Sequence, residues 1–444
     1  MVSNKVIYAL SIVVVVLLIV NAYLITSFIG LQNRTTELAN AVNEVSSGLS
    51  DVNERLNEVL SRIEELTGKV SELASKYEVL SSDVIKVKEE VSSKVSEVKE
   101  DLSSLDETVK SLAIRVGDEI KGLKKLHEEL REKVRDLISS VKYPMVITDA
   151  LGRTVVIPYE PKRVVSVAPS ITEIIFGIGA GSKVVGVDEY SNYPPEVMEL
   201  REKGVIEVVG GFATLNIEKI IALNPDLVVM VKFGAQIKHI DALAKVGIPV
   251  LVLSDESMEE IFRSILILGV VLNKPSEAID LVTTMRTELL SIHEEVSTYL
   301  AEHNLSKLRV YFEVWPDPLG TIGNASFIND IITLAGGINV FGNESWSYSI
   351  ITSEEVIARA PDVIVTTTHG GLYGGASDVL EMIMTRPGWD AIPAVKNGRV
   401  YVFAGEYEDI MVRPGPRVVK AVEALAKVLY PEAFGESPPP NIIS

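Results

Sequence analysis

The chain has 444 residues, a formal net charge of −19 and no cysteine. The length allows two or three domains, and the acidic balance excludes the basic surface with which proteins bind nucleic acid. The lack of cysteine excludes disulfides, thiolate metal sites and a cysteine nucleophile.

Residues 1–30 are predicted to form a transmembrane signal anchor. No charged residue occurs at 6–29, and a run of this length crosses a hydrocarbon core of about 30 Å as a helix. The alternative is a cleaved signal peptide, but those have shorter apolar runs, and residues 22–24 make a poor cleavage site. Lys5 precedes the span and Arg34 follows it. We therefore expect a single-pass cell-membrane protein with a cytoplasmic N-terminus and an extracellular body.

Residues 31–142 are predicted to form a coiled-coil stalk. Apolar residues recur there at steps of three and four, as they do from Val42 to Val91, with polar residues between them. This heptad seam is typical of a left-handed coiled coil. So narrow a seam needs a partner helix, so we expect a parallel homo-oligomer, with dimer and trimer both open. The alternative is one long helix that packs on its own body.

Residues 143–435 alternate short strands with helices, which predicts α/β lobes with mainly parallel sheets. We expect an N-terminal lobe at 143–274, a long interlobe helix at 275–303 and a C-terminal lobe at 304–435. The tail at 436–444 is polar and rich in proline, and is predicted to be disordered.

An internal repeat indicates that the two lobes are similar. EKIIALNPDLVV stands at 218–229 and EEVIARAPDVIV at 354–365, each reading as a helix, a Pro-Asp turn and a buried strand. The repeat pairs Glu218 with Glu354. An alternative explanation for both acids is helix capping, because carboxylates stabilise the first turn of a helix.

Several motifs in the body resemble those of the substrate-binding proteins of ABC importers for metal chelates, which bind cobalamin, ferric siderophores and haem. The motifs cover about residues 145–430 in order, and they stand at 149–158, 161–174, 179–186, 193–195, 215–226, 326–337, 386–389 and 397–401. The resemblance implies two lobes joined by a helix, with the chelate in the cleft between them. It also implies that Glu218 and Glu354 dock on arginines of a permease dimer. The stalk lies outside the family pattern.

Ligand-binding residues should lie in loops that follow strands, because ligands of open α/β sheets bind there. The candidates are Tyr190, Phe212, Lys232, Trp315, Tyr348, His369, Tyr407 and Arg413. Aromatic walls with a few polar groups suit a large flat chelate. Phe212 and Tyr348 stand where cobalamin binders carry aromatic residues. Val231 stands where those binders carry a further aromatic residue, which argues against cobalamin. Lys232 and Arg413 suit an anionic ferric chelate, and His369 suits a metal, although each candidate alone is more often a packing or surface group.

The sequence therefore predicts a membrane-anchored extracellular receptor that captures a metal chelate and delivers it to an ABC permease dimer with its ATPase. No resident cofactor, structural metal site or nucleic-acid partner is expected. No catalytic constellation stands out, so we do not expect an enzyme. The alternative is a stalked cell-surface ligand sensor or adhesion protein that reuses the fold. An adjacent pair of permease and ATPase genes would favour the importer.

Overall fold

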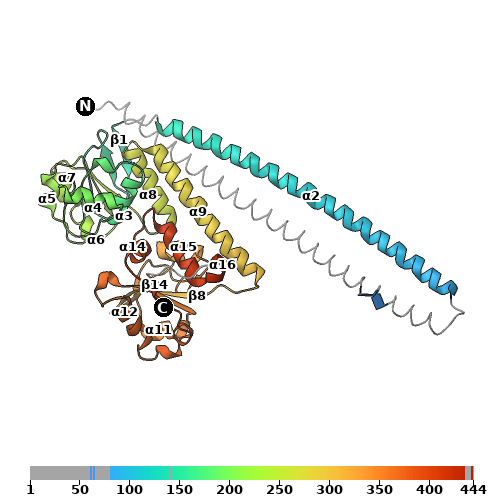
Figure 1. Cartoon of the computed structure of the whole chain (residues 1–444). Coiled ribbons are helices and arrows are strands. Elements are labelled where there is room, and N and C mark those ends of the chain that lie inside the picture. Colours follow the sequence, from blue (N-terminus) through green and yellow to red (C-terminus); the bar gives the residue numbers. More distant parts are fainter. Residues whose placement is uncertain (1–60, 63, 66–80, 140–142, 436–441, 444) are drawn as a thin grey trace. The chain divides into compact units, whose positions relative to one another are not determined.

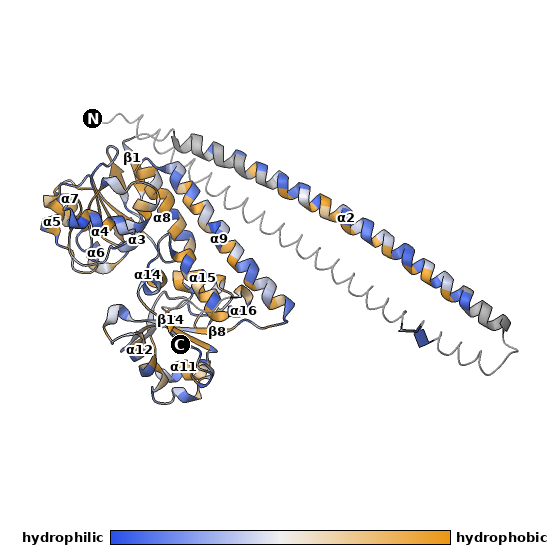
Figure 2. Ribbon diagram, in the orientation of Figure 1, coloured by the Kyte–Doolittle hydropathy of each residue, from blue (hydrophilic) through white to orange (hydrophobic). Residues whose placement is uncertain are grey.

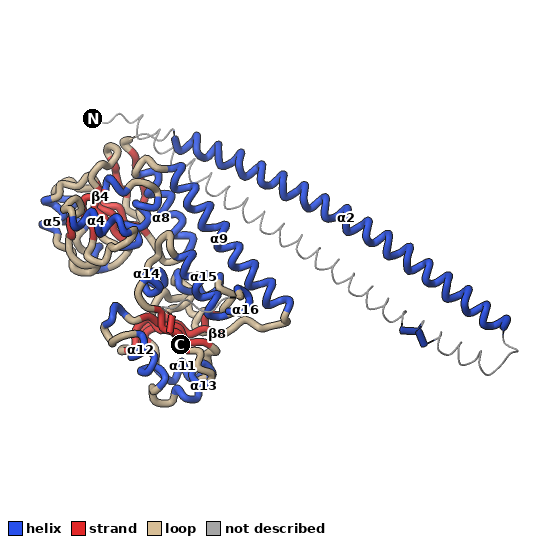
Figure 3. The backbone as a smooth tube through the Cα atoms, in the orientation of Figure 1, coloured by secondary structure: helices blue, strands red, loops and turns tan. Residues whose placement is uncertain are grey.

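Residues 143–435 fold into two lobes, each built around a β-sheet and joined by one long helix (Figures 1 and 3). The structure is a computed structural model that describes residues 61–62, 64–65, 81–139, 143–435 and 442–443. The chain divides into two units, Met1–Asp136 and Leu137–Ser444. The lobes belong to the second unit.

The first unit contains most of a single helix, α2 (Ser81–Ser139), of 59 residues. Apolar residues recur along it at steps of three and four (Val95, Val98, Leu102, Leu105, Val109, Leu112 and Val116). Figure 2 shows apolar and polar residues interspersed along the helix. This spacing continues the seam predicted for the stalk. The predicted anchor at 1–30 and most of the stalk before residue 81 lie outside the described residues. The pairing of stalk helices stays a prediction.

The N-terminal lobe is built on a five-stranded parallel sheet with the strand order β5-β4-β3-β6-β7. Its strands are β3 (Val164–Ser166), β4 (Val184–Val187), β5 (Glu207–Val208), β6 (Leu227–Val231) and β7 (Val250–Leu253). Every residue of β6 is buried, as expected for a strand covered on both faces. The hairpin β1 (Met145–Thr148) and β2 (Thr154–Ile157) precedes the sheet.

Helices connect the strands of the N-terminal lobe, and one more, α8, follows the last strand. They are α3 (Pro169–Gly177), η1 (Gly181–Lys183), α4 (Pro195–Glu202), α5 (Ile217–Ala222), α6 (Gly234–Ile237), α7 (Ile240–Lys245) and α8 (Met258–Val271). The first copy of the repeat forms α5 and β6.

The helix expected at 275–303 is α9 (Pro275–Glu302), with 28 residues. Its buried residues recur at steps of three and four (Ala278, Val282, Met285, Leu289, Ile292, Val296 and Leu300), which is the stripe of an amphipathic helix. The helix packs against α8 of the N-terminal lobe and against α10 and α15 of the C-terminal lobe. A single stiff element therefore joins the two lobes.

The sheet of the C-terminal lobe has a parallel centre and antiparallel edges. The strands are β8 (Arg309–Pro316), β9 (Leu319–Thr321), β10 (Ile338–Asn339), β11 (Ser349–Ile350), β12 (Val363–Thr367), β13 (Val400–Phe403) and β14 (Ile442–Ile443). β8, β12 and β13 run parallel, whereas β9, β11 and β14 pair antiparallel with their neighbours. Parallel strands at the centre match the predicted fold class, although the edges were not foreseen.

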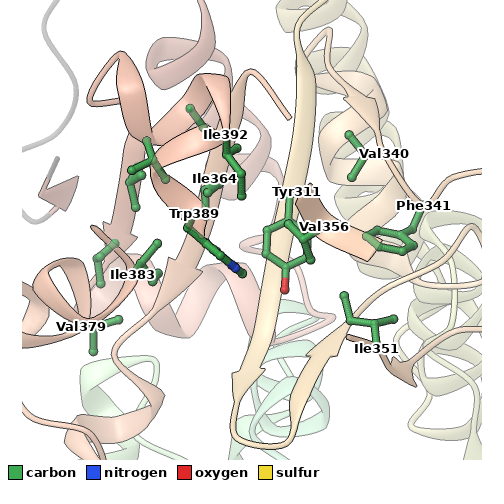
Figure 4. Packing of buried hydrophobic residues seen from close by; sticks show 14 of the residues in the cluster. Tyr311, Val340, Phe341, Ile351, Val356, Ile364, Val379, Ile383, Trp389 and Ile392 are labelled. Carbon is green, nitrogen blue, oxygen red and sulfur yellow. The ribbon is translucent and has the colours of Figure 1, made fainter. Parts of the chain in front are cut away.

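The helices of this lobe are α10 (Phe327–Leu334), α11 (Ser353–Arg359), η2 (His369–Gly371), α12 (Ala376–Met384), η3 (Trp389–Ala391), α13 (Pro393–Lys396), α14 (Glu406–Val412), α15 (Val418–Leu429) and α16 (Pro431–Phe434). The second copy of the repeat forms α11 and β12. Tyr311 lies between Phe341 and Trp389 in the core (Figure 4), with ring centroids 6.1 and 5.9 Å away.

The tail predicted to be disordered contains a strand. Ile442 and Ile443 form β14, which pairs with Phe403 and Val402 of β13. Ile442 is buried, so two apolar residues close this edge of the sheet despite the polar composition of the tail. Residues 436–441 and 444 lie outside the described residues.

Candidate functional site

The carboxyl ends of the strands in both lobes lead into loops, and one loop of each lobe contacts the other lobe. We call the segments 188–193, 210–216, 232–233 and 254–257 of the N-terminal lobe, together with 315–318, 368–375 and 404–413 of the C-terminal lobe, the strand-end loops. Arg413 of the C-terminal lobe donates a hydrogen bond of 2.6 Å to the Asn192 side chain of the N-terminal lobe. Asn192 also donates to Asp409, at 3.3 Å. Parallel sheets bind ligands at this end of their strands.

Three candidates of the N-terminal lobe lie at successive strand ends. Tyr190 follows β4 and is 55% exposed, Phe212 follows β5, and Lys232 comes directly after β6. The ring of Phe212 lies 5.0 Å from that of Phe233, a residue that was not among the predicted candidates. The Lys232 ammonium pairs with Glu256 at 3.3 Å. The lobe thus presents aromatic rings beside a cation that already has a partner.

A buried glutamine fixes the position of these strand ends. The Gln236 amide donates to the carbonyls of Val167 and Phe212, at 2.9 and 3.0 Å, and accepts from the Val231 N–H at 3.1 Å. Gly210 has φ of +110°, and a Cβ there would lie 2.4 Å from a backbone oxygen. Only glycine fits so close a turn. The loop that carries Phe212 is therefore held firmly.

Hydroxyl groups hold the loop that carries Tyr190. The fully buried Asp188 carboxylate accepts from the Ser191 hydroxyl and, at 2.9 Å, from the Tyr190 N–H. The Ser191 hydroxyl also forms a hydrogen bond of 2.9 Å with the Thr172 hydroxyl, which in turn forms one of 2.8 Å with the Ser166 hydroxyl. Burial raises the pKa of Asp188, against the effect of these hydrogen bonds.

In the C-terminal lobe, Trp315, His369 and Tyr373 form an aromatic trio. The ring centroids lie 5.2 Å apart for Trp315 and His369, 5.8 Å for Trp315 and Tyr373, and 5.6 Å for His369 and Tyr373, all edge to face. This is the preferred geometry of aromatic pairs. Trp315 and His369 were predicted, whereas Tyr373 was not.

The His369 ring is held in a partly buried position. The Glu408 carboxylate accepts from the Thr368 hydroxyl and from the Gly370 N–H, at 2.8 Å, and so fixes the loop after β12. Desolvation lowers the pKa of His369, and the charge of Glu408 opposes this shift only in part. The imidazole is therefore neutral at pH 7. Among the described residues no group of three histidine, aspartate or glutamate side chains is placed to hold a metal ion.

Tyr348 and Tyr407 lie outside the aromatic trio. Tyr348 precedes β11, is 46% exposed, and covers Gly320, where a Cβ would lie 2.4 Å from the tyrosine oxygen. Tyr407 is the second residue of α14 and is half-buried. The ring contacts found among the described residues do not connect either tyrosine to the trio.

Arg413 joins the two lobes instead of standing free. Its guanidinium pairs with Asp409 at 2.6 Å and donates to Asn192 at 2.6 Å and to the Tyr190 carbonyl at 3.2 Å. Its side chain is only 11% exposed. The sequence suggested that Arg413 faces an anionic chelate, but here its donors are already engaged.

A second interlobe contact was not foreseen. Glu173 of α3 and Arg417, which directly precedes α15, form a buried pair with two hydrogen bonds, of 2.6 and 2.9 Å. The Arg417 guanidinium also stacks on Tyr193, 3.9 Å from the ring centroid.

Two surface hollows of about 380 and 440 Å³ lie away from the strand-end loops, one between α9 and α15 and one beside α10 and β10.

Glu218 and Glu354 occupy the same position in equivalent helices. Each is the second residue of its helix, α5 or α11, and each is exposed. Asn216 and Thr352 are the N-caps, and Thr352 forms the predicted capping box with Glu355. Because these caps already satisfy the helix starts, the two acids are not needed for capping.

The comparisons with known proteins all indicate the same family. Residues 164–407 match the family model described as periplasmic binding protein. The uncharacterized ABC transporter substrate-binding lipoprotein YvrC of Bacillus subtilis is 35% identical over 298 residues, which cover 66% of this chain and 88% of that protein. A vitamin B12-binding protein of Vibrio parahaemolyticus is 28% identical over 261 residues, covering 59% of this chain and 86% of its own length.

The fold is also similar to that of a solved structure. A possible iron-binding (periplasmic solute-binding) protein from Staphylococcus epidermidis has a TM-score of 0.52 and 28% identity, and the match covers 61% of this chain and 99% of that one.

The predicted localisation, a single-pass cell-membrane protein with a cytoplasmic N-terminus, is wrong. It rested on the apolar run at 6–29, which lies outside the described residues. The Bacillus subtilis relative is named a lipoprotein, a class attached to membranes by lipid and not by a spanning helix. Across the described residues, the helices are too short or too polar to cross a bilayer.

Proposed function

This chain belongs to the periplasmic binding protein family, and on that premise we propose that it captures a metal chelate and delivers it to the permease of an ABC importer. The family consists of binding proteins, so the chain is a binding protein and not an enzyme. The proposed ligand is a ferric siderophore, a cobalamin or a haem, and the proposed partner is a permease dimer with its ATPase. The aromatic side chains at the strand ends of both lobes carry this proposal.

The ligand would bind against the strand-end loops. Tyr190, Phe212 and Phe233 come from one sheet, and the trio of Trp315, His369 and Tyr373 comes from the other. Sites for large flat ligands are mostly apolar and aromatic, with a few polar groups that set the orientation. Aromatic rings supply large contact areas at small cost in conformational entropy. The arrangement therefore suits a chelate with broad faces.

The eight predicted residues keep different proposed roles. Tyr190, Phe212, Trp315, Tyr348 and Tyr407 would contact the faces of the ligand, and His369, being neutral, would offer a ring nitrogen to a metal or a polar group. Lys232 would lie at the rim, where its pair with Glu256 is exposed to solvent. Arg413 would act indirectly, by holding the Tyr190 loop in place.

Glu218 and Glu354 are the proposed contacts with the permease. Both carboxylates are exposed, and neither forms an ion pair among the described residues. Paired cations on a partner would orient the protein and increase its rate of association. Two matched acids, one on each lobe, fit a partner with two equivalent halves.

The stalk is proposed to make the chain a homo-oligomer. Its described part, α2, carries an apolar seam, and Leu102 on this seam is 43% exposed. A second copy of the same helix would cover the seam.

Binding of a chelate panel to the full-length chain tests the proposed function. Cyanocobalamin, ferrioxamine B and haem would be added in turn, and complexes detected by native mass spectrometry and by tryptophan fluorescence. We expect one chelate class to bind with 1:1 stoichiometry. Tyr190→Ala should weaken binding about tenfold, which corresponds to a loss of about 1.4 kcal/mol.

Tyr159→Ala is the matched control, because Tyr159 is 56% exposed against 55% for Tyr190 and lies away from the strand-end loops. Equal losses from the two substitutions would contradict the proposed site. Binding of a chelate without stimulation of a partner ATPase would favour the ligand-sensor alternative. Failure of all three chelates to bind would overturn the proposed function.

A further inference from the structure

The cations that touch the strand-end loops are already neutralised by carboxylates. Lys232 pairs with Glu256 at 3.3 Å. Arg413 pairs with Asp409 at 2.6 Å, and Arg417 pairs with Glu173 at 2.6 Å. Their positive charges are therefore largely compensated before any ligand arrives.

Two further cations lie close to these loops. Arg201 donates to the carbonyls of Glu189 and Ser191, at 3.2 and 2.9 Å, so its donors hold the backbone. Lys238, at the end of α6, is exposed. It is the one described cation near the loops for which neither an ion pair nor a hydrogen bond of the side chain was found.

Carboxylates on the same loops outnumber these cations. They come from both lobes and are Asp188, Glu189, Asp255, Glu256, Asp317, Glu406, Glu408 and Asp409. Glu189 accepts from the Tyr190 phenol and thereby raises the pKa of that group. Burial and the neighbouring acids raise the pKa of Asp255 to about 6, which leaves it mostly ionised at pH 7.5. The surface therefore carries a surplus of negative charge at neutral pH.

Large apolar side chains are also exposed on these loops. Tyr190, Phe233, Leu372 and Val412 are 55, 41, 63 and 43% exposed. Apolar side chains this exposed within one set of loops mark a surface that binds something. A ligand that covers them would be stabilised by apolar burial, and its charge would be felt by the surrounding carboxylates.

We propose that the strand-end loops select metal chelates without net negative charge, that is, neutral or cationic chelates with broad apolar faces, and reject anionic ones. This inference rests on the proposed function and specifies its ligand class. A cluster of negative charges repels an anionic ligand as it approaches and also after it has bound, so it lowers both the rate of association and the affinity. An anionic chelate would need a free cation, whereas the described cations of the loops are engaged.

The test compares chelates that share a scaffold and differ only in charge. The pairs are cyanocobalamin and its monocarboxylic acid, ferrioxamine B and its N-succinyl derivative, and haem dimethyl ester and haem. Dissociation constants would be measured with the full-length chain at low and at high salt. For the scaffold that binds, the anionic member should bind at least tenfold more weakly at low salt. This ratio of dissociation constants should become smaller at high salt, because ions screen the repulsion between the loops and the anionic chelate.

Charge variants make the test specific to these loops. Glu256→Gln removes one carboxylate and leaves Lys232 without its ion-pair partner. It should therefore reduce the ratio of the dissociation constants of the anionic chelate and its uncharged or cationic counterpart. Glu277→Gln is the matched control. Glu277 pairs with Lys274 and is 45% exposed, as Glu256 is, but it lies in the first turn of α9. The control substitution should leave this ratio of dissociation constants unchanged.

Tighter binding of the anionic member would overturn the inference while leaving the proposed function intact. The same holds if both members bind equally, or if Lys238→Ala abolishes the binding of an anionic chelate. Failure of every scaffold to bind would overturn the proposed function and the inference with it.

Discussion

Glu173 and Arg417 connect the two lobes through a buried, doubly hydrogen-bonded ion pair. Arg417 donates from Nε to Oε2 at 2.9 Å and from Nη2 to Oε1 at 2.6 Å, and the residues are 4 and 6% exposed. Arg413 adds a weaker contact of 3.5 Å to the same carboxylate. This pair therefore adds a second connection between the lobes to that made by α9, which packs against helices of both.

Glu173→Gln should destabilise the folded body by about 3 kcal/mol. The substitution leaves Arg417 buried with an uncompensated charge, and breaking a buried pair from one side costs about 3–5 kcal/mol. Glutamine retains part of the hydrogen bonding, which places the loss at the lower end. Urea unfolding of the full-length chain at pH 7 would measure the change.

Glu406→Gln is the control for this prediction. Glu406 is 56% exposed and lies 3.6 Å from the same guanidinium, and exposed pairs contribute about 0–1 kcal/mol. Similar losses from Glu173→Gln and Glu406→Gln would show that burial does not determine the strength of this interlobe contact.

Asp255→Asn should stabilise the protein more at pH 7.5 than at pH 4.5. Burial raises the pKa of Asp255 from the usual 3.8 to about 6, so the folded state binds the proton more tightly than the unfolded chain does. Protonated Asp255 therefore favours the folded state. This contribution to the free energy of unfolding is complete below the pKa of the unfolded chain and is lost as the pH rises from about 4 to about 6. Removing the group should therefore gain about 2 kcal/mol more at pH 7.5 than at pH 4.5.

Denaturant unfolding of both proteins at the two pH values checks this expectation. Asp241→Asn serves as the reference, because Asp241 is exposed in the first turn of α7. A gain from Asp255→Asn that is the same at both pH values would contradict the raised pKa.

Leu102→Asp should weaken self-association of the full-length chain. Leu102 lies on the apolar seam of α2 and is 43% exposed, and a charge there would have to be buried against the partner helix. Ile114→Asp is the control, because Ile114 is 65% exposed and lies off the seam. Sedimentation velocity at micromolar concentration distinguishes the species. A monomeric parent chain would refute the homo-oligomer.

The fold of the body was accessible from the sequence because its signals are local. The Pro-Asp turns at 225–226 and 361–362 each precede a short run of β-branched residues, and these became β6 and β12. Pro275 opens the long apolar stripe of α9. The same local reasoning failed at Ile442 and Ile443, whose strand depends on an edge that β13 offers from elsewhere in the chain.

The site was predicted only in part, for a related reason. Residues near the carboxyl ends of strands, such as Tyr190 after β4 and Trp315 in the last residues of β8, can be located once the strands are known. Glu173 and Arg417 are 244 residues apart, and no spacing within either segment indicates that they meet. Arg413 was expected to face an anionic chelate, but it bonds to Asn192 and to the Tyr190 carbonyl of the other lobe, and no local pattern indicates these partners.

Replacing both Glu218 and Glu354 with glutamine should impair delivery and leave capture unchanged. The two acids lie at equivalent helix starts, one on each lobe, and outside the strand-end loops. Chelate affinity should change by less than about threefold. Stimulation of the partner ATPase should fall strongly, because charge pairs desolvated at an interface contribute several kcal/mol. Single substitutions should have smaller effects, since the two contacts share the docking.

Glu355→Gln is the matched control for the double variant, because Glu355 lies next to Glu354 and forms the capping box with Thr352. Glutamine at this position still accepts the hydrogen bond from the N-cap backbone, so delivery should be retained. Weaker chelate binding with intact permease binding would mean that Glu218 and Glu354 belong to the ligand site. If the double substitution changed neither property, electrostatic stabilisation of the two helix starts would be their whole role. Only the loss of ATPase stimulation with unchanged chelate affinity fits the docking role, because it separates the two surfaces in one experiment.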